Sequence, residues 1–159
     1  KGKPVEINKA DEKKIQVIEF WATWCGPCRT SIPHLTKLQK KFKNKGVTII
    51  GVTDEKKSTV ERFVRREGEQ MEYTVAIEKG DSMSQSYMRA YGQTGIPSAF
   101  VVDQKDRIVW VGHPMNGLEE VIDRLVKGTF DLETEIAKKK AKKQQQKMTE
   151  KYLERVLEG

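Results

Sequence analysis

The fold is decided by Trp24-Cys-Gly-Pro-Cys28, a segment that contains both cysteines of this 159-residue chain. Residues 15–20, just before it, form a nearly continuous apolar run, which is typical of a central strand in a sheet covered on both faces. Residues 29–43, just after it, carry apolar side chains at helical spacing and predict an amphipathic helix. A Cys-x-x-Cys pair where a strand ends and a helix begins is typical of a dithiol that is reversibly oxidised to a disulfide.

The predicted placement gives the two cysteines different roles. A helix N-terminus leaves backbone N–H groups unpaired and carries partial positive charge, so it stabilises a thiolate at Cys25. The pKa of Cys25 is expected to fall from roughly 8.5 towards about 7 or below, and the thiolate is the attacking species in disulfide exchange. Cys28, one helical turn later, would resolve the mixed disulfide. Gly26 and Pro27 fill the first turn, where proline loses no helical hydrogen bond.

Two other uses of the cysteine pair fit the sequence less well. A zinc site needs four ligands, and the chain adds only two histidines, His34 and His113, which are expected to be surface residues. His34 lies on the same predicted helix as Cys28 and would point elsewhere. A purely structural disulfide over so short a loop would remove little entropy from the unfolded chain. No metal or organic cofactor is expected to be needed.

Two segments resemble a known family. Val17-Ile-Glu-Phe-Trp-Ala-Thr-Trp-Cys-Gly-Pro-Cys28 resembles the active-site segment of the thioredoxin superfamily, and Gly95-Ile-Pro-Ser-Ala-Phe-Val-Val-Asp103 resembles its second signature. The rest of residues 3–128 is similar to the TlpA-like branch, the extracytoplasmic thiol–disulfide oxidoreductases. The resemblance implies a redox-active disulfide, protein thiols or disulfides as substrates, and an upstream redox donor. It also favours a periplasmic or secreted location over a cytoplasmic one.

Glu19 is the first supporting residue, because it stands in an otherwise apolar strand, where a buried carboxylate is unfavourable unless it is paired or has a role. In thioredoxins the matching acid lies beneath the resolving cysteine and assists its deprotonation. Glu19 is therefore expected to have a raised pKa and to act as general base for Cys28. The alternative is a residue that faces solvent at a strand end. The lysine that often pairs with this acid has no counterpart in residues 49–52.

Pro97 is the second supporting residue. Sequence alone predicts a trans bond, because only about 5–6% of X–Pro bonds are cis. The resemblance instead implies a cis-proline that lies against the dithiol, so that the backbone of Ile96 can pair with substrate like an added strand. Trp24 is expected to form part of the substrate-docking surface together with Gly26 and Pro27, and Trp21 to be buried against the sheet.

The remaining pattern predicts an α/β domain over residues 1–128. Strands are expected at 47–53, 73–77, 98–102 and 107–111, and helices at 58–67, 83–91 and 117–127. This order is consistent with a thioredoxin fold, a mixed central sheet flanked by helices on both faces. The chain begins at Lys1-Gly-Lys-Pro without an initiating Met, as a processed chain would, and residues 4–8 match the second strand of an N-terminal hairpin in the family.

Residues 129–159 are expected to form a charged C-terminal helical extension. Residues 138–147 hold six lysines and no acid, which is typical of a solvated helix. Attachment to a following helical domain is the alternative, and nucleic-acid binding is not favoured because no aromatic residues are interleaved with the lysines. No apolar stretch approaches 18 residues, so no membrane span is expected.

The sequence thus predicts an enzyme, a thiol–disulfide oxidoreductase of the protein-disulfide reductase type. The Gly-Pro dipeptide between the cysteines resembles that of reducing thioredoxins and favours the reducing direction, with a potential on the order of −270 to −200 mV. The alternative is a thioredoxin-like docking module of a larger multidomain protein. A peroxidase is disfavoured, because peroxidases of the superfamily use a different cysteine context.

Overall fold

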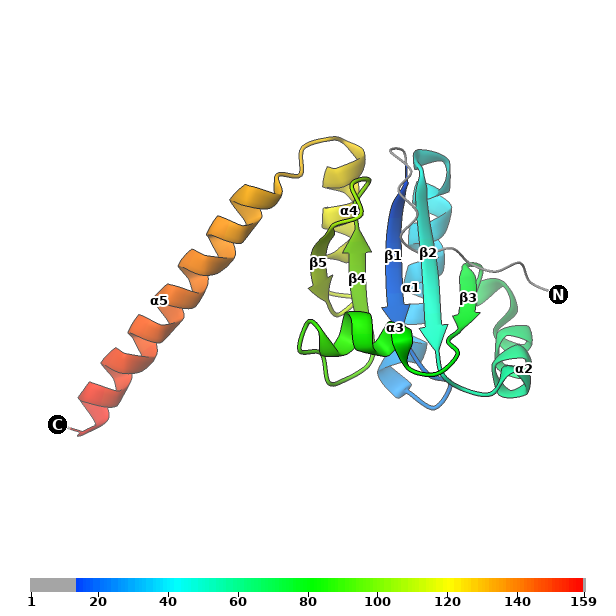
Figure 1. Cartoon of the computed structure of the whole chain (residues 1–159), viewed down its shortest axis with the longest axis horizontal. Helices are drawn as coiled ribbons and strands as arrows, with labels where there is room; N and C mark the ends of the chain where they lie inside the picture. The colour runs from blue at the N-terminus through cyan, green and yellow to red at the C-terminus, as the bar shows by residue number, and fades with distance from the viewer. Residues whose placement is uncertain (1–13, 159) are drawn as a thin grey trace. The chain divides into compact units, whose positions relative to one another are not determined.

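The computed structural model describes residues 14–158 (Figure 1). The strand expected at residues 4–8 lies outside the described residues. The chain divides into two compact units, Lys1–Gly128 and Thr129–Gly159. The cysteine pair belongs to the first unit.

The centre of the first unit is a sheet with five strands in the described residues, in the order β3-β2-β1-β4-β5. β1 is parallel to β2 and antiparallel to β4, and β2 is parallel to β3. β1 is therefore the central strand of a mixed sheet, as predicted. The strands are β1 (Ile15–Phe20), β2 (Val47–Thr53), β3 (Thr74–Ile77), β4 (Ser98–Val102) and β5 (Ile108–Gly112).

Helices cover both faces of this sheet. α1 and α4 lie on one side of it and α3 on the other (Figure 1). The helices of this unit are α1 (Gly26–Phe42), α2 (Lys57–Glu67), α3 (Ser82–Ser84) and α4 (Leu118–Val126). The helix predicted at 29–43 begins three residues earlier, because Gly26 and Pro27 occupy first-turn positions whose N–H groups have no helical partner in any case. Most other predicted boundaries agree within one residue.

The short helix predicted at 83–91 is present over residues 82–89, but most of it is not a regular α-helix. α3 is a single turn, and it passes into a π-helical turn over Gln85–Arg89. The N–H of Ala90 bonds to the carbonyl of Gln85, and the N–H of Gln93 to that of Met88 at 2.8 Å. Such a turn carries an extra residue, and here the adjacent residues Tyr87 and Met88 are both buried against the sheet.

The two faces of β1 contribute to different parts of the interior, because side chains alternate along a strand. Ile18 and Phe20 belong to the cluster under α3, which consists of Ile18, Phe20, Ile50, Val52, Tyr87, Met88, Phe100 and Val102. Val17, Glu19 and Trp21 point to the opposite face, and all three are buried. The sheet therefore carries the carboxyl group of Glu19 into the interior.

The turn between β4 and β5 is organised by Asp103. Its Oδ1 accepts hydrogen bonds from the backbone N–H groups of Lys105 and Arg107, both at 2.9 Å. Its Oδ2 accepts from Nε and Nη2 of Arg107 at 2.9 and 2.7 Å. Burial opposes ionisation of this carboxyl, but the hydrogen bonds from Arg107 and Lys105 outweigh it and hold the pKa of Asp103 below its usual range. The predicted hairpin turn is thus held by one ionised side chain.

The second unit contains α5 (Leu132–Glu158), a helix of 27 residues whose lysine-rich segment is exposed. Large apolar side chains of its last turns are exposed as well: Met148, Tyr152, Leu153, Val156 and Leu157. Within the described part of the chain, every helix is too short or too polar to cross a lipid bilayer.

Candidate active site

Cys25 and Cys28 lie at the junction of β1 and α1, and a disulfide joins them. Cys25 is the N-cap residue of α1, and Cys28 stands in its first turn. Cys25 keeps 4% of its surface exposed, whereas Cys28 is fully buried. An incoming substrate can therefore reach the first sulfur but not the second.

The start of α1 favours negative charge on Cys25. The backbone N–H of Cys28 lies 3.2 Å from Cys25 Sγ, which accepts its hydrogen bond. The first turn of the helix contains no acidic residue, and its free N–H groups carry partial positive charge. In the reduced protein the same donor would stabilise a thiolate at Cys25.

The loop before β4 brings Ile96 to the dithiol. The Ile96–Pro97 peptide bond is cis, and the carbonyl oxygen of Ile96 lies 3.7 Å from Cys25 Sγ. Pro97 is buried and Ile96 is half-buried. The hydroxyl of Ser98 donates to the carbonyl of Gly95 at 2.7 Å and closes the turn that presents Ile96. Two segments about 70 residues apart in the sequence thus meet at one sulfur atom.

Glu19 is fully buried, so the solvent-facing alternative is wrong. Neither of its carboxylate oxygens has a hydrogen-bond partner among the described residues. Burial without compensating donors disfavours the charged form and raises the pKa of Glu19 from 4.5 to about 8. The residue opposite on β2 is Gly51, so no lysine stands at that position.

Trp21 and Tyr73 occupy the space over Gly51. A Cβ atom on Gly51 would lie 3.0 Å from Trp21 Nε1 and 3.1 Å from Tyr73 Cε2. Both side chains end in buried polar atoms without a partner among the described residues. Burial, and then the charge of Glu19, raise the pKa of Tyr73. Tyr73 was not predicted as a site residue, although it begins the strand expected at 73–77, which pairs with the strand that holds Gly51.

The loop that carries Trp24 is tied down on both sides. Its neighbour Thr23 donates its backbone N–H and its hydroxyl to the carboxylate of Glu55, at 2.7 and 2.6 Å. The carbonyl of Thr23 accepts from Nε of Arg29 at 2.9 Å. Trp24 itself is 70% exposed beside the nearly buried Cys25, a placement that suits the predicted docking surface.

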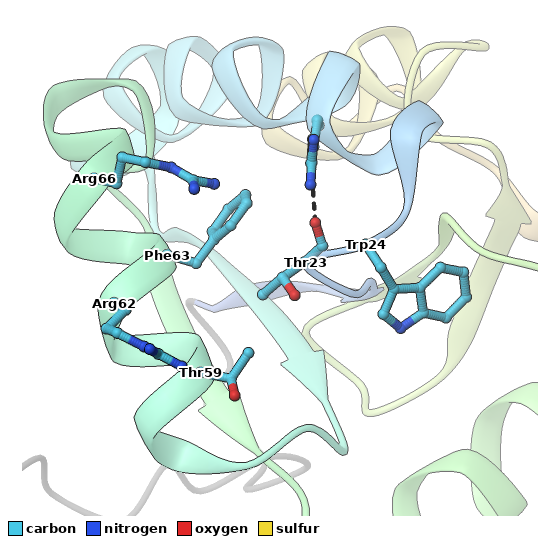
Figure 2. Close-up of a pocket in the computed structure, with 7 residues that line it drawn as sticks. Thr23, Trp24, Thr59, Arg62, Phe63 and Arg66 are labelled. Carbon is cyan, nitrogen blue, oxygen red and sulfur yellow. Dashed lines mark hydrogen bonds between the residues drawn. The ribbon is translucent and has the colours of Figure 1, made fainter.

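A pocket of about 370 Å³ opens beside Trp24, between the start of α1 and one face of α2 (Figure 2). This pocket was not predicted from the sequence, because the residues that line it come from two separate segments of the chain. It is lined by Thr23, Trp24, Arg29, Thr59, Arg62, Phe63 and Arg66.

The two histidines lie in different settings. His34 is half-buried on α1, and the half-buried His113 accepts the backbone N–H of Met115 at Nδ1, 3.2 Å away. The described residues hold no group of three or more His, Cys, Asp or Glu side chains placed to share a metal ion.

Known proteins resemble this chain in sequence. The Redoxin family model matches residues 1–123. The thiol-disulfide oxidoreductase ResA of Bacillus anthracis is 35% identical over 109 residues, which cover 68% of this chain and 59% of that protein. The ResA protein of Halalkalibacterium halodurans is 31% identical over 127 residues, 79% of this chain and 68% of that protein. The chain thus spans about three fifths of the length of the first of these relatives.

Solved structures agree with the fold. A putative thiol:disulfide interchange protein DsbE from Chlorobium tepidum is 26% identical, with a TM-score of 0.58 over 74% of this chain and 81% of that one. A thiol:disulfide interchange protein from Bacteroides sp. is 23% identical, with a TM-score of 0.63 over 76% of this chain. The thioredoxin fold and the TlpA-like resemblance predicted from the sequence are confirmed.

Proposed function

This chain belongs to the Redoxin family, and from that premise we propose that it is a thiol–disulfide oxidoreductase that reduces protein disulfides with the Cys25–Cys28 pair. The observation that carries the proposal is the position of the two sulfurs. Cys25 caps α1 with one edge exposed, and Cys28 lies buried one turn later within disulfide reach.

The reaction takes place between the dithiol of Cys25 and Cys28 and one disulfide of the substrate. The thiolate of Cys25 attacks one sulfur of the substrate disulfide, and the other substrate sulfur leaves as a thiolate that takes up a proton. Cys28 then loses its proton and attacks Cys25 Sγ in the mixed disulfide, which releases the second substrate sulfur. Two electrons pass to the substrate, and the protein is left with the Cys25–Cys28 disulfide. An upstream dithiol donor must reduce this bond before the next cycle.

Glu19 is proposed as the acid–base group for Cys28. With a pKa of about 8, its carboxyl can exchange a proton with a thiol whose ordinary pKa is roughly 8.5, since the two groups are closely matched. As a carboxylate it would accept the proton of Cys28 during resolution. As a carboxylic acid it would return a proton to Cys28 when the donor opens the disulfide.

The substrate is proposed to lie in extended form across Ile96 and Pro97, with Trp24, Gly26 and Pro27 on its other side. The contact between Ile96 O and Cys25 Sγ supports this, because a strand paired with the backbone there would pass over the attacking sulfur. We place the protein outside the cytoplasm, in the periplasm or secreted, because the TlpA-like branch that it resembles is extracytoplasmic. The proposed partners are proteins and not nucleic acids.

Reduction of insulin disulfides in the presence of dithiothreitol tests the activity. Wild type should accelerate the reduction, and Cys25→Ser should abolish the effect. Reduced Cys28→Ser, freed of dithiothreitol and then mixed with insulin, should accumulate a mixed disulfide that is visible on a non-reducing gel. A wild-type protein without this activity, whose Cys25→Ser, Cys28→Ser double variant still captures partners, would be a docking module instead.

A redox titration of the pair against glutathione tests the direction. We expect a potential on the order of −270 to −200 mV, in the range of reducing proteins of this chemistry. A potential near about −120 mV, typical of a strong oxidant, would overturn the reducing direction.

A further inference from the structure

The pocket beside Trp24 gathers three arginine side chains. Arg29 comes from the first turn of α1, and Arg62 and Arg66 come from α2 (Figure 2). Arg62 and Arg66 are four residues apart and share a face of their helix, where like charges destabilise the helix slightly. A fold that brings a third guanidinium to the same place concentrates positive charge there.

Two of these guanidinium groups lie over the ring of one buried phenylalanine, Phe63. The guanidinium carbons of Arg29 and Arg66 lie 5.9 and 5.1 Å from the ring centroid of Phe63. Phe63 is itself buried, and its ring lies 5.4 Å from that of Trp21. Figure 2 shows the side chain of Arg66 directed towards this ring. The guanidinium groups of Arg29 and Arg66 are therefore positioned in part by packing against the core.

The acids nearby do not fully balance this positive charge. Among the described residues, the one acidic partner of the three arginines is the half-buried Glu67, whose carboxylate lies 3.5 Å from Nε of Arg66. Nε of Arg29 donates to a neutral carbonyl, that of Thr23. The carboxylate of Glu55 accepts three hydrogen bonds, from the backbone and hydroxyl of Thr23 and from the hydroxyl of Thr53. These neutral donors leave the negative charge of Glu55 in place beside Thr23, but the three guanidinium groups outnumber the carboxylates of Glu55 and Glu67, so the pocket keeps an excess of positive charge.

We propose that this pocket binds an acidic side chain of the polypeptide whose disulfide Cys25 attacks. The inference rests on the proposed function and adds a sequence preference to it. Guanidinium groups match carboxylates with paired hydrogen bonds, and Thr59 offers a further hydroxyl in the same wall. Trp24 lines the pocket and directly precedes Cys25, so a carboxylate seated here lies a few residues from the reacting cysteine along the bound chain.

The test uses three disulfide-bonded peptides with amidated ends that differ at one position flanking the target cysteine: Glu, Gln or Lys. We expect kcat/KM of the full chain to be highest for the Glu peptide and lowest for the Lys peptide, with about a tenfold span at low salt. The span should shrink as salt rises, because the pocket is open to solvent. The span should narrow in the single variant Arg62→Gln, and it should narrow further, to about two- to threefold, in the double variant Arg62→Gln, Arg66→Gln.

Arg65→Gln is the matched control. Arg65 is an exposed arginine of the same helix that does not line the pocket, so its substitution removes one positive charge, as Arg62→Gln alone does, and should leave the full span. Equal rates for the three peptides, or the same loss of preference in Arg65→Gln as in Arg62→Gln, would overturn the acidic-side-chain site. Failure of wild type to reduce even the Gln peptide would instead overturn the proposed function.

Discussion

At the scale of single residues, burial controls the ionisation of Glu19. The native state keeps this carboxyl protonated up to its raised pKa of about 8, whereas the unfolded chain releases the proton above 4.5. Between these values the unfolded state binds fewer protons, so the free energy of unfolding falls as pH rises, by up to about 1.4 kcal/mol per pH unit. Above the raised pKa the fall ends.

Glu19→Gln should remove this pH dependence, because the amide cannot ionise in either state. Urea unfolding of the oxidised proteins at pH 5 and pH 8 measures it. From pH 5 to pH 8 the free energy of unfolding should fall more in wild type than in Glu19→Gln. The same difference between wild type and variant at both pH values would contradict the raised native pKa.

Gly51 is the residue whose lack of a side chain shapes the surroundings of Glu19. Gly51→Ala should destabilise the protein by about 1–3 kcal/mol, because the new methyl group would press on the rings of Trp21 and Tyr73. Gly26→Ala is the control, since a Cβ there has open space and a helical alanine is favourable. Thermal unfolding of both variants checks the prediction, and a Gly51→Ala protein as stable as Gly26→Ala would refute it.

At the scale of elements, one carboxylate joins β4 to β5. Asp103→Asn should cost about 1–3 kcal/mol at pH 7, because it replaces charge-assisted hydrogen bonds to Arg107 with neutral ones. The native pKa of Asp103 is lowered, so this stabilisation is complete above its ordinary pKa of 3.8 and is lost as pH falls through the native value.

Urea unfolding at pH 7 and pH 3 compares wild type with Asp103→Asn. The difference between the two proteins should shrink at the lower pH. Asp106→Asn is the matched control, because Asp106 is an exposed residue of the same turn and asparagine tolerates its positive φ of 56°. If Asp106→Asn lowered the free energy of unfolding as much as Asp103→Asn does, the effect would come from the net charge of the turn and not from the hydrogen bonds of Asp103.

The elements also differ in how far the sequence predicted them. β1, β2 and β4 lie where their apolar runs predicted, because each run is long enough for a buried strand and is bounded by polar or turn residues. The π-helical turn at Gln85–Arg89 was not predictable from periodicity. It depends on the burial of two adjacent side chains, Tyr87 and Met88, against a sheet that forms elsewhere in the chain.

At the scale of the whole molecule, we propose that residues 1–128 fold and react without residues 129–159. Among the described residues, every buried hydrophobic residue lies in the first unit, while the large apolar residues near the end of α5 are exposed. Removal of 129–159 should change the midpoint of thermal unfolding and the rate of insulin reduction only slightly. A shortened chain that fails to fold, or that loses most of its activity, would show that the extension belongs to the domain.

The reactive cysteine pair, and the residues expected to assist it, could be predicted from the sequence alone. A local motif places Cys25 at the start of a helix, and a resemblance over residues 3–128 pointed to Glu19, Ile96 and Pro97. These predictions depend on local spacing or on a shared family pattern.

The other neighbours of that pair became visible only in the tertiary structure. Glu55, Tyr73, Arg62 and Arg66 belong to no motif, and they come near the cysteine pair only because separate strands and helices pack together. The burial that raises the pKa of Glu19, and the buried ring that aligns Arg29 with Arg66, likewise arise from contacts between elements. Such contacts join residues that are distant in the chain, so local sequence patterns cannot encode them.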